Sequence, residues 1–196
     1  MNRRTLLAAT AIALPLAMAI PATAAPAPAV TVESARTVAP VEDSASAAAV
    51  RTLTDPSASS SRQLAAVPAG LNYRAAAGPG YALNPHGDCS SLVRLPADFT
   101  APCQAHDLGY DVLRLADSAG RPLGGWARLR IDETLADRLG AVCAHRPAAQ
   151  RRECGQVAAI AMLAVRANTW RQHDGPPRAE SGTELAASWI SAGGRL

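Results

Sequence analysis

The chain has 196 residues, which is enough for one small domain with flanking segments. Its formal charge is only +3, and its 19 basic residues are all arginines dispersed along the sequence. Proteins that bind nucleic acids usually carry a clustered basic face, so we expect no nucleic-acid partner.

The first 24 residues have the pattern of a cleaved signal peptide. Arg3 and Arg4 precede an uncharged apolar run over residues 6–20, and the small residues 22–24 suit signal peptidase. The run is too short to span a bilayer comfortably. We therefore expect a secreted protein without a transmembrane segment, exported by the general or the twin-arginine route.

Residues 25–64 are rich in Ala, Pro, Ser and Thr, as in APAPAV and DPSASSSR. Such a composition buries too little apolar surface to offset the entropy lost on ordering. The sequence therefore predicts a linker or propeptide over 25–64, a folded domain over 65–175, and a tail over 176–196.

The exported part contains an even number of cysteines, which indicates disulfides in an oxidising compartment. Three pairings of the four are possible. The short loops favour Cys89–Cys103 and Cys143–Cys154, each worth about 3 kcal/mol through loop entropy. A zinc site is not expected, because the sequence has no C-x-x-C pair.

Residues 77–88, AGPGYALNPHGD, are full of Gly and Pro and predict a loop. Thr100 then has the position of an N-cap for a helix over 101–115. His106 and Tyr110 are four residues apart and so share one face of that helix. Its expected apolar side consists of Ala105, Leu108, Val112 and Leu115.

Two further helices are expected over 130–143 and 155–170, and HDGPP at 173–177 ends the second of them. The helix over 155–170 is apolar nearly all round, which is typical of a helix deep in a core. Asp132 lies at the edge of the buried stripe of the helix over 130–143, where its carboxylate can turn toward a neighbouring helix. That stripe consists of Ile131, Leu135, Leu139 and Val142. The sequence thus predicts a small all-α domain: two long antiparallel helices linked by disulfides, a third core helix, and a glycine-bearing loop.

Residues 103–110, CQAHDLGY, resemble the C-x-x-H-D-x-x-Y helix of secreted phospholipase A2, most of all its small bacterial and fungal type with two disulfides. The likeness includes Phe99 upstream and Asp132, which stands eleven residues before Cys143. It extends over residues 87–154 and implies a phospholipase A2-like fold with a calcium loop.

The resemblance implies a hydrolase of lipid degradation that cleaves the sn-2 ester of glycerophospholipids in membranes or micelles and acts as a monomer. His106 would be the general base that takes a proton from water, and Asp132 would orient its ring. Tyr110 would support this pair. Calcium held by Asp107 would polarise the ester carbonyl.

The expected calcium loop departs from the family pattern in one place. In that subfamily an aspartate commonly stands two positions before the cysteine, whereas here Gly87 and Asp88 precede Cys89, so the acid is one residue closer. Either the loop shifts in register and Asp88 still reaches the metal, or Gly87 contributes only its carbonyl. The second arrangement weakens binding, because calcium affinity follows the number of charged ligands.

Two other functions compete with a phospholipase A2. The altered calcium loop suits a catalytically weak or inactive protein that binds a membrane or a partner. A disulfide-linked helical module without an active site is the third possibility, although it leaves the pairing of His106 with Asp132 without a purpose. We assign no role to His86, His145 or His173.

Overall fold

The computed structural model describes residues 41–91 and 95–193. The expected signal peptide and the expected linker up to residue 40 lie outside these residues. The described part is mostly helical and contains a single two-stranded β-ribbon. The expectation of a small all-α domain is thereby confirmed at the level of fold class. None of the helices in that part is long and apolar enough to cross a membrane.

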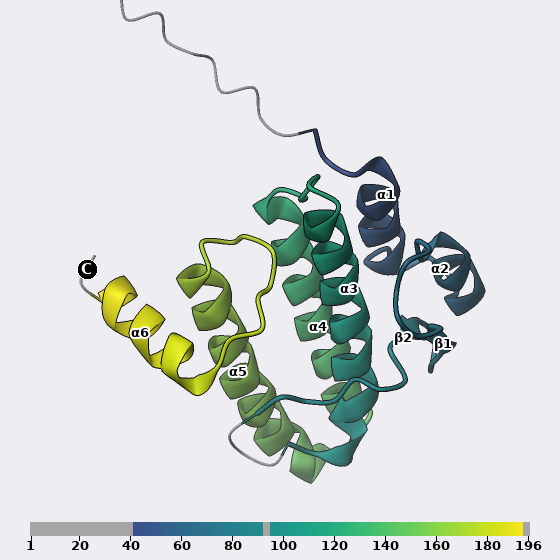
Figure 1. The fold of residues 1–196 in the computed structure, drawn as a ribbon. Helices are drawn as coiled ribbons and strands as arrows, with labels where there is room; N and C mark the ends of the chain where they lie inside the picture. Colours follow the sequence, from purple (N-terminus) through teal and green to yellow (C-terminus); the bar gives the residue numbers. More distant parts are fainter. Residues whose placement is uncertain (1–40, 92–94, 194–196) are drawn as a thin grey trace, which may run out of the picture. The chain divides into compact units, whose positions relative to one another are not determined.

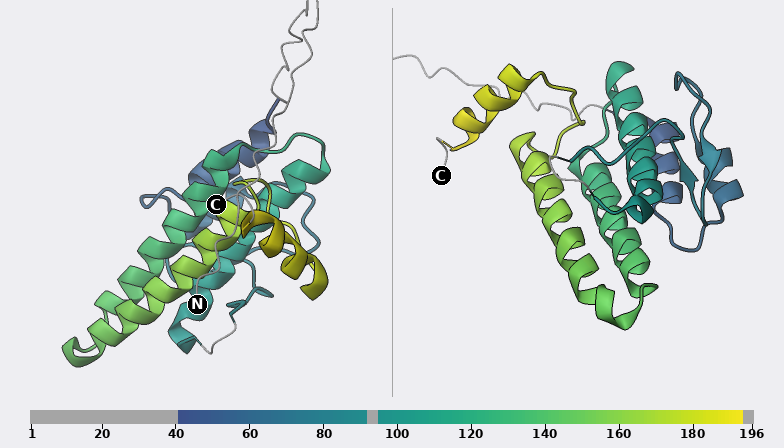
Figure 2. Two further views of the ribbon diagram at one scale, coloured as in Figure 1. Left: turned by 90° about the vertical axis from the view of Figure 1, so that its left-hand side faces the viewer. Right: turned by 90° about the horizontal axis from the view of Figure 1, so that it is seen from below.

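Three long helices that follow one another in the chain form the centre of the domain: α3 (Thr100–Ser118), α4 (Gly125–Ala144) and α5 (Ala148–Arg171). Short connections turn the chain back each time, so α3 packs against α4 and α4 against α5 (Figures 1 and 2). Gly109 permits a close approach of the first pair, since a Cβ there would lie 2.9 Å from Ile131 Cγ2.

The apolar stripes expected for α3 and α4 are largely the buried ones. Leu108 and Val112 are fully buried, and Ile131, Leu135 and Leu139 are at most 5% exposed. A second apolar cluster, which shares Leu135 and Leu139 with the α4 stripe, joins α4 to α5 and to the segment before α3. It consists of Phe99, Leu135, Leu139, Cys143, Cys154, Ala158 and Met162.

The helix ends differ from the expected ones. A short 3-10 helix, η1 (Ala97–Phe99), leads directly into α3, so Thr100 lies inside the helix and Phe99 occupies the N-cap position without a side-chain bond. The prediction of a Thr100 cap is wrong because η1 already provides the first turn. Both α4 and α5 begin earlier than expected, at Gly125 and Ala148.

Helix α5 is not buried all round, which corrects the expectation for residues 155–170. Ile160 and Leu163 are 60% and 66% exposed, whereas Ala158 and Met162 face the core. The helix packs with one side only, because α4 covers it along that side. Mean apolarity did not distinguish the two faces of this helix.

Helix α1 (Ser44–Leu53) and most of α2 (Ser60–Ala66) lie where the sequence predicts a linker. The Ser46 N–H donates to Asp43 Oδ1 at 2.8 Å and caps α1. Val50 is fully buried and Leu53 nearly so, in a cluster that includes residues of α3 and α4. Residues 44–66 thus differ from the expected linker, because small alanine side chains here pack closely enough to form part of a core.

The Gly/Pro-rich segment before Cys89 contains the small β-ribbon rather than loop alone. Strand β1 (Ala76–Ala77) pairs antiparallel with β2 (Ala82–Leu83), and Ala76 stands opposite Leu83. The turn between them requires Gly80, whose φ is +91°. Gln63 of α2 accepts a hydrogen bond from the Ala82 N–H at 2.9 Å and so holds the ribbon against the helices.

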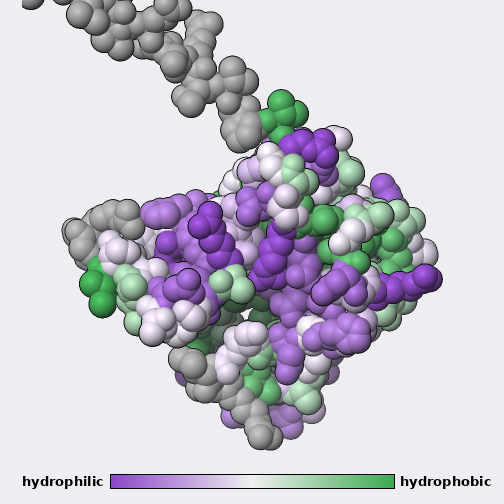
Figure 3. All heavy atoms as spheres, viewed as in Figure 1, coloured by the Kyte–Doolittle hydropathy of each residue, from purple (hydrophilic) through white to green (hydrophobic). Residues whose placement is uncertain are grey.

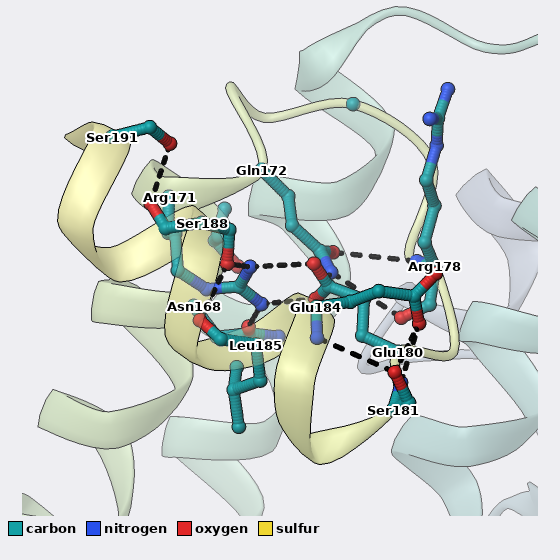
Figure 4. A network of polar contacts seen from close by, with 12 residues as sticks. Asn168, Arg171, Gln172, Arg178, Glu180, Ser181, Glu184, Leu185, Ser188 and Ser191 are labelled. Carbon is teal, nitrogen blue, oxygen red and sulfur yellow. Dashed lines mark hydrogen bonds and ion pairs between the residues drawn. The ribbon is translucent and has the colours of Figure 1, made fainter.

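The C-terminal segment forms helix α6 (Gly182–Gly193), which a polar network ties to the end of α5 (Figure 4). The buried Arg171 of α5 binds both carboxylate oxygens of Glu180. Gln172 donates to Glu180 Oε2 at 2.7 Å. The residues expected to be a tail are thus attached to the domain up to residue 193.

Both expected disulfides are confirmed, with Cys89 joined to Cys103 and Cys143 to Cys154. The second bridge connects the end of α4 to the start of α5 and closes a loop of 11 residues. Replacing Cys143 and Cys154 together by Ser is expected to lower the free energy of unfolding by about 3 kcal/mol. Urea denaturation of this variant and the parent protein measures the difference, and equal midpoints with equal slopes would contradict it.

The Arg171–Glu180 pair predicts that the C-terminal segment detaches in acid. The hydrogen bond from Arg171 lowers the pKa of Glu180 from 4.5 to about 2. A carboxylate with a lowered folded pKa contributes fully above its unfolded pKa, and the contribution is lost as the pH falls toward about 2. We expect the amide NMR signals of α6 to shift between these two pH values. In Glu180→Gln the same signals should lack this transition; an identical transition there would refute the assignment to Glu180.

Candidate active site

Helix α3 carries three of the residues that the sequence singles out: His106, Asp107 and Tyr110. The rings of His106 and Tyr110 lie on the same side, with their centroids 4.0 Å apart. Both side chains are buried, at 9% and 7% exposure. The four-residue spacing therefore places them side by side, as one turn of helix requires.

His106 contacts Asp132 of α4 directly, with 2.8 Å between Nε2 and Oδ1. An ionised carboxylate only accepts hydrogen bonds, so Nε2 carries the proton and donates it. In a neutral imidazole this leaves a lone pair on Nδ1. The expected approach of these two side chains is present, and the arrangement selects Nδ1 as the atom able to accept a proton.

Two hydroxyl groups complete the surroundings of Asp132. Tyr110 Oη donates to Oδ1 at 2.8 Å, and Thr169 Oγ1 of α5 donates to Oδ2 at 2.6 Å. Asp132 is only 3% exposed, so these bonds replace the water that the carboxylate loses on burial. Three side chains, two from α3 and one from α5, thus converge on one carboxylate of α4.

The buried phenol of Tyr110 remains a hydrogen-bond donor over a wide pH range. Burial, followed by the nearby negative charge of Asp132, raises the pKa of Tyr110 to about 12, although Arg128 opposes this rise. The bond from Tyr110 to Asp132 is therefore retained at any pH at which an imidazole could act as a base.

Sequence reasoning missed Thr169 and Arg128. Thr169 is 2% exposed and stands seven residues after Met162, on the inward side of α5, so a polar residue at a core position was the available signal. Arg128 is 1% exposed and lies four residues before Asp132 on α4. Its spacing places it on the same face as Asp132. The chain has many dispersed arginines, however, and nothing in the sequence distinguishes the buried one from the exposed ones.

The candidate calcium loop lies against Asp107. The Asp88 N–H donates to Asp107 Oδ2 at 3.0 Å, and a Cβ added to Gly87 would lie 2.5 Å from the same oxygen. The disulfide between Cys89 and Cys103 fixes this loop to α3. The structure therefore brings Gly87, Asp88 and Asp107 together.

Asn84 and Asp111 hold the start of the same loop in place. The Asn84 N–H donates to the Gln104 carbonyl at 3.0 Å, and the Asn84 side chain donates to Asp111 Oδ2, also at 3.0 Å. Tyr73 donates to that same oxygen at 2.7 Å. Gln104 and Asp111 of α3 thus hold Asn84, at the start of the loop that faces Asp107.

The region around Asp107 offers oxygen atoms, which are the ligands that a hard cation prefers. Burial raises the pKa of Asp107 even though the Asp88 N–H bond acts in the opposite direction. Such a carboxylate is poorly solvated, and a cation beside it would relieve that cost. The Asp107 carboxylate can approach the Gly87 backbone closely because Gly87 has no side chain; a Cβ there would lie 2.5 Å from Oδ2. Carboxylate and backbone oxygens are the ligands that calcium prefers.

The Asp88 side chain is directed elsewhere. Its Oδ1 accepts a hydrogen bond from the Cys89 N–H at 2.7 Å. Among the described residues there is no group of three or more His, Cys, Asp or Glu side chains arranged to hold a metal. The Asp88 oxygen that accepts from the Cys89 N–H is thus used within the loop itself.

One cleft in the described part lies away from His106. It has a volume of about 350 Å³ and lies between the α1–α2 connection, Tyr81 and the outer face of α4, where Arg138 stacks on the Tyr81 ring. A separate hollow opens near the centre of the face in Figure 3, in the region between α5 and the α3–α4 pair of Figure 1.

Comparison with known proteins identifies no relative. No protein-family model, no curated protein and no solved structure matches the chain.

Proposed function

We propose that the chain is a secreted, calcium-dependent phospholipase A2 that hydrolyses the sn-2 ester of glycerophospholipids. The observation that carries this proposal is the 2.8 Å bond from His106 Nε2 to Asp132 Oδ1. The residue after His106 in α3 is Asp107, which faces a glycine-containing loop. The two disulfides support export, since such bonds persist in oxidising compartments.

His106 is the general base in this proposal. Its Nδ1 accepts a proton from a water molecule as that water attacks the ester carbonyl. Asp132 keeps the ring in the required tautomer and stabilises the imidazolium as it forms. No nucleophilic side chain and no covalent intermediate are needed, because the attacking group is water itself.

Asp107 and the Gly87 backbone would hold the calcium ion. A calcium ion there supplies a Lewis acid for the ester carbonyl and a positive charge for the developing oxyanion. Asp107 follows His106 directly in α3, so the acid that holds the metal and the base that takes the proton belong to one rigid element. We propose phospholipid membranes or micelles as the substrate form, and a monomer as the active species.

The orientation of the Asp88 carboxylate favours one alternative. A loop with a single acidic ligand binds calcium weakly, so the chain could bind membranes or a partner without turnover. Calorimetry separates the two functions: lipid association without calcium binding at millimolar concentrations would favour the binding protein.

The proposal is tested with vesicles of a phosphatidylcholine that carries different acyl chains at sn-1 and sn-2. With calcium present, the released acid should be the sn-2 chain and the second product the lysophospholipid with the sn-1 chain. A calcium chelator should stop the reaction. Release of the sn-1 chain, or no release in millimolar calcium, would rule the proposal out.

A further inference from the structure

The two hydroxyls beside Asp132 could in principle direct their protons elsewhere. Tyr110 Oη and Thr169 Oγ1 are 3.5 Å apart, so either could donate to the other instead of to the carboxylate. Each hydroxyl has one proton. Asp132 therefore receives both hydrogen bonds only if another group prevents the two hydroxyls from donating to each other.

Arg128 supplies that direction. Its Nε lies 3.0 Å from Thr169 Oγ1 and 3.3 Å from Tyr110 Oη. A guanidinium has donors and no acceptor, so both hydroxyls must accept from it. Their own protons then remain for Asp132, which accepts one on each oxygen.

Arg128 is itself held from the C-terminal side. Its NH1 donates to Gln172 Oε1 and to the Gly175 carbonyl, both at 2.8 Å. The other end of the Gln172 amide donates to Glu180, as Figure 4 shows. The guanidinium carbon also lies 5.1 Å from the centroid of the Tyr110 ring, within the range of a cation–π contact.

We propose that Arg128 is a positioning residue of the hydrolytic site, which acts through Tyr110 and Thr169 to fix the Asp132 carboxylate and, through it, the His106 ring. At 1% exposure Arg128 cannot touch a substrate, so its effect has to pass through these two hydroxyls. The inference rests on the proposed function for its kinetic consequence but not for its hydrogen-bond arrangement.

Kinetics of Arg128→Met test the proposal. We expect kcat to fall about tenfold, as for the loss of other supporting partners of a site, with KM unchanged. In a protein that already carries Tyr110→Phe and Thr169→Val, Arg128→Met should lower kcat no further, because the two hydroxyls through which Arg128 acts are absent. The matched control is Arg138→Met, the same change later on α4, where Arg138 contacts Tyr81 and the Leu53 carbonyl instead. An equal fall of kcat in both backgrounds would overturn the proposal.

NMR of the unchanged protein gives a second test that needs neither activity nor a folded variant. The Arg128 Nε–H and the hydroxyl protons of Tyr110 and Thr169 should exchange slowly with water. Nuclear Overhauser contacts should connect the Nε–H to both hydroxyls. A rapidly exchanging Nε–H would overturn the proposal even if the protein hydrolyses phospholipid. If hydrolysis is absent, only the proposed function fails, and these signals still decide the role of Arg128.

Discussion

Replacing His106 by Gln is expected to lower kcat for phospholipid hydrolysis at least about 100-fold, the lower end of what a general base contributes. Gln can still donate a hydrogen bond to Asp132, so the buried carboxylate keeps a partner and the fold is retained. What the variant lacks is a basic nitrogen in the place of Nδ1. The measurement is the initial rate of fatty acid release from vesicles at saturating calcium.

The matched control for this change is His145→Gln. His145 is exposed at the end of α4, and its ring Nδ1 bonds only locally, to the Ala141 carbonyl at 2.7 Å. We expect its rate to equal that of the parent protein. Retention of full activity in His106→Gln would remove His106 from the mechanism.

Replacing Asp107 by Asn is expected to weaken calcium binding at least about tenfold, because the site loses its most favourably placed negative charge. The amide oxygen of Asn can still accept the hydrogen bond from the Asp88 N–H, so the loop should remain in place. Activity at low calcium should fall in the same proportion. Isothermal titration calorimetry with calcium, together with rates measured against calcium concentration, checks both statements.

Asp88→Asn separates the two candidate acids. The Asp88 carboxylate accepts from the Cys89 N–H, so we expect a much smaller loss of calcium affinity than in Asp107→Asn. Asp117→Asn, on the exposed end of α3, is the control and should change nothing. A larger loss in Asp88→Asn than in Asp107→Asn would mean that the loop adopts the other register when calcium is bound.

Local spacing in the sequence predicts the part of the site that lies on one helix. His106 and Tyr110 share a face because they are four residues apart, and Asp107 follows His106 directly. The position of Asp132 at the edge of its apolar stripe indicated a side chain able to turn inward. Helical periodicity determines all of these placements, and it is a property of the chain read locally.

Contacts that depend on packing could not be read from the chain. Thr169 bonds to Arg128 and Asp132 only because the end of α5 packs beside the start of α4. Periodicity gives the face of a residue but not the partner that the face meets. Spacing on α5 could indicate that Thr169 faces inward, but not that it bonds to an aspartate 37 residues earlier.

Alanine-rich segments were the main source of error in the fold. Helix α1 consists largely of Ala and Ser, and these small side chains allow it to pack closely against α3. Composition alone predicts that such a segment buries too little apolar surface to fold. For α5 the same abundance of alanine made an exposed face resemble a buried one, so exposure followed from the neighbours and not from hydropathy.

In the proposed mechanism, Asp132 accepts a hydrogen bond from His106 Nε2 and so leaves Nδ1 free to take a proton. The nitrogen NMR spectrum of the His106 ring, recorded where the imidazole is neutral, tests this most directly. We expect a protonated Nε2 and an unprotonated Nδ1. A spectrum in which Nδ1 carries the proton would contradict it, because no base would then face the attacking water.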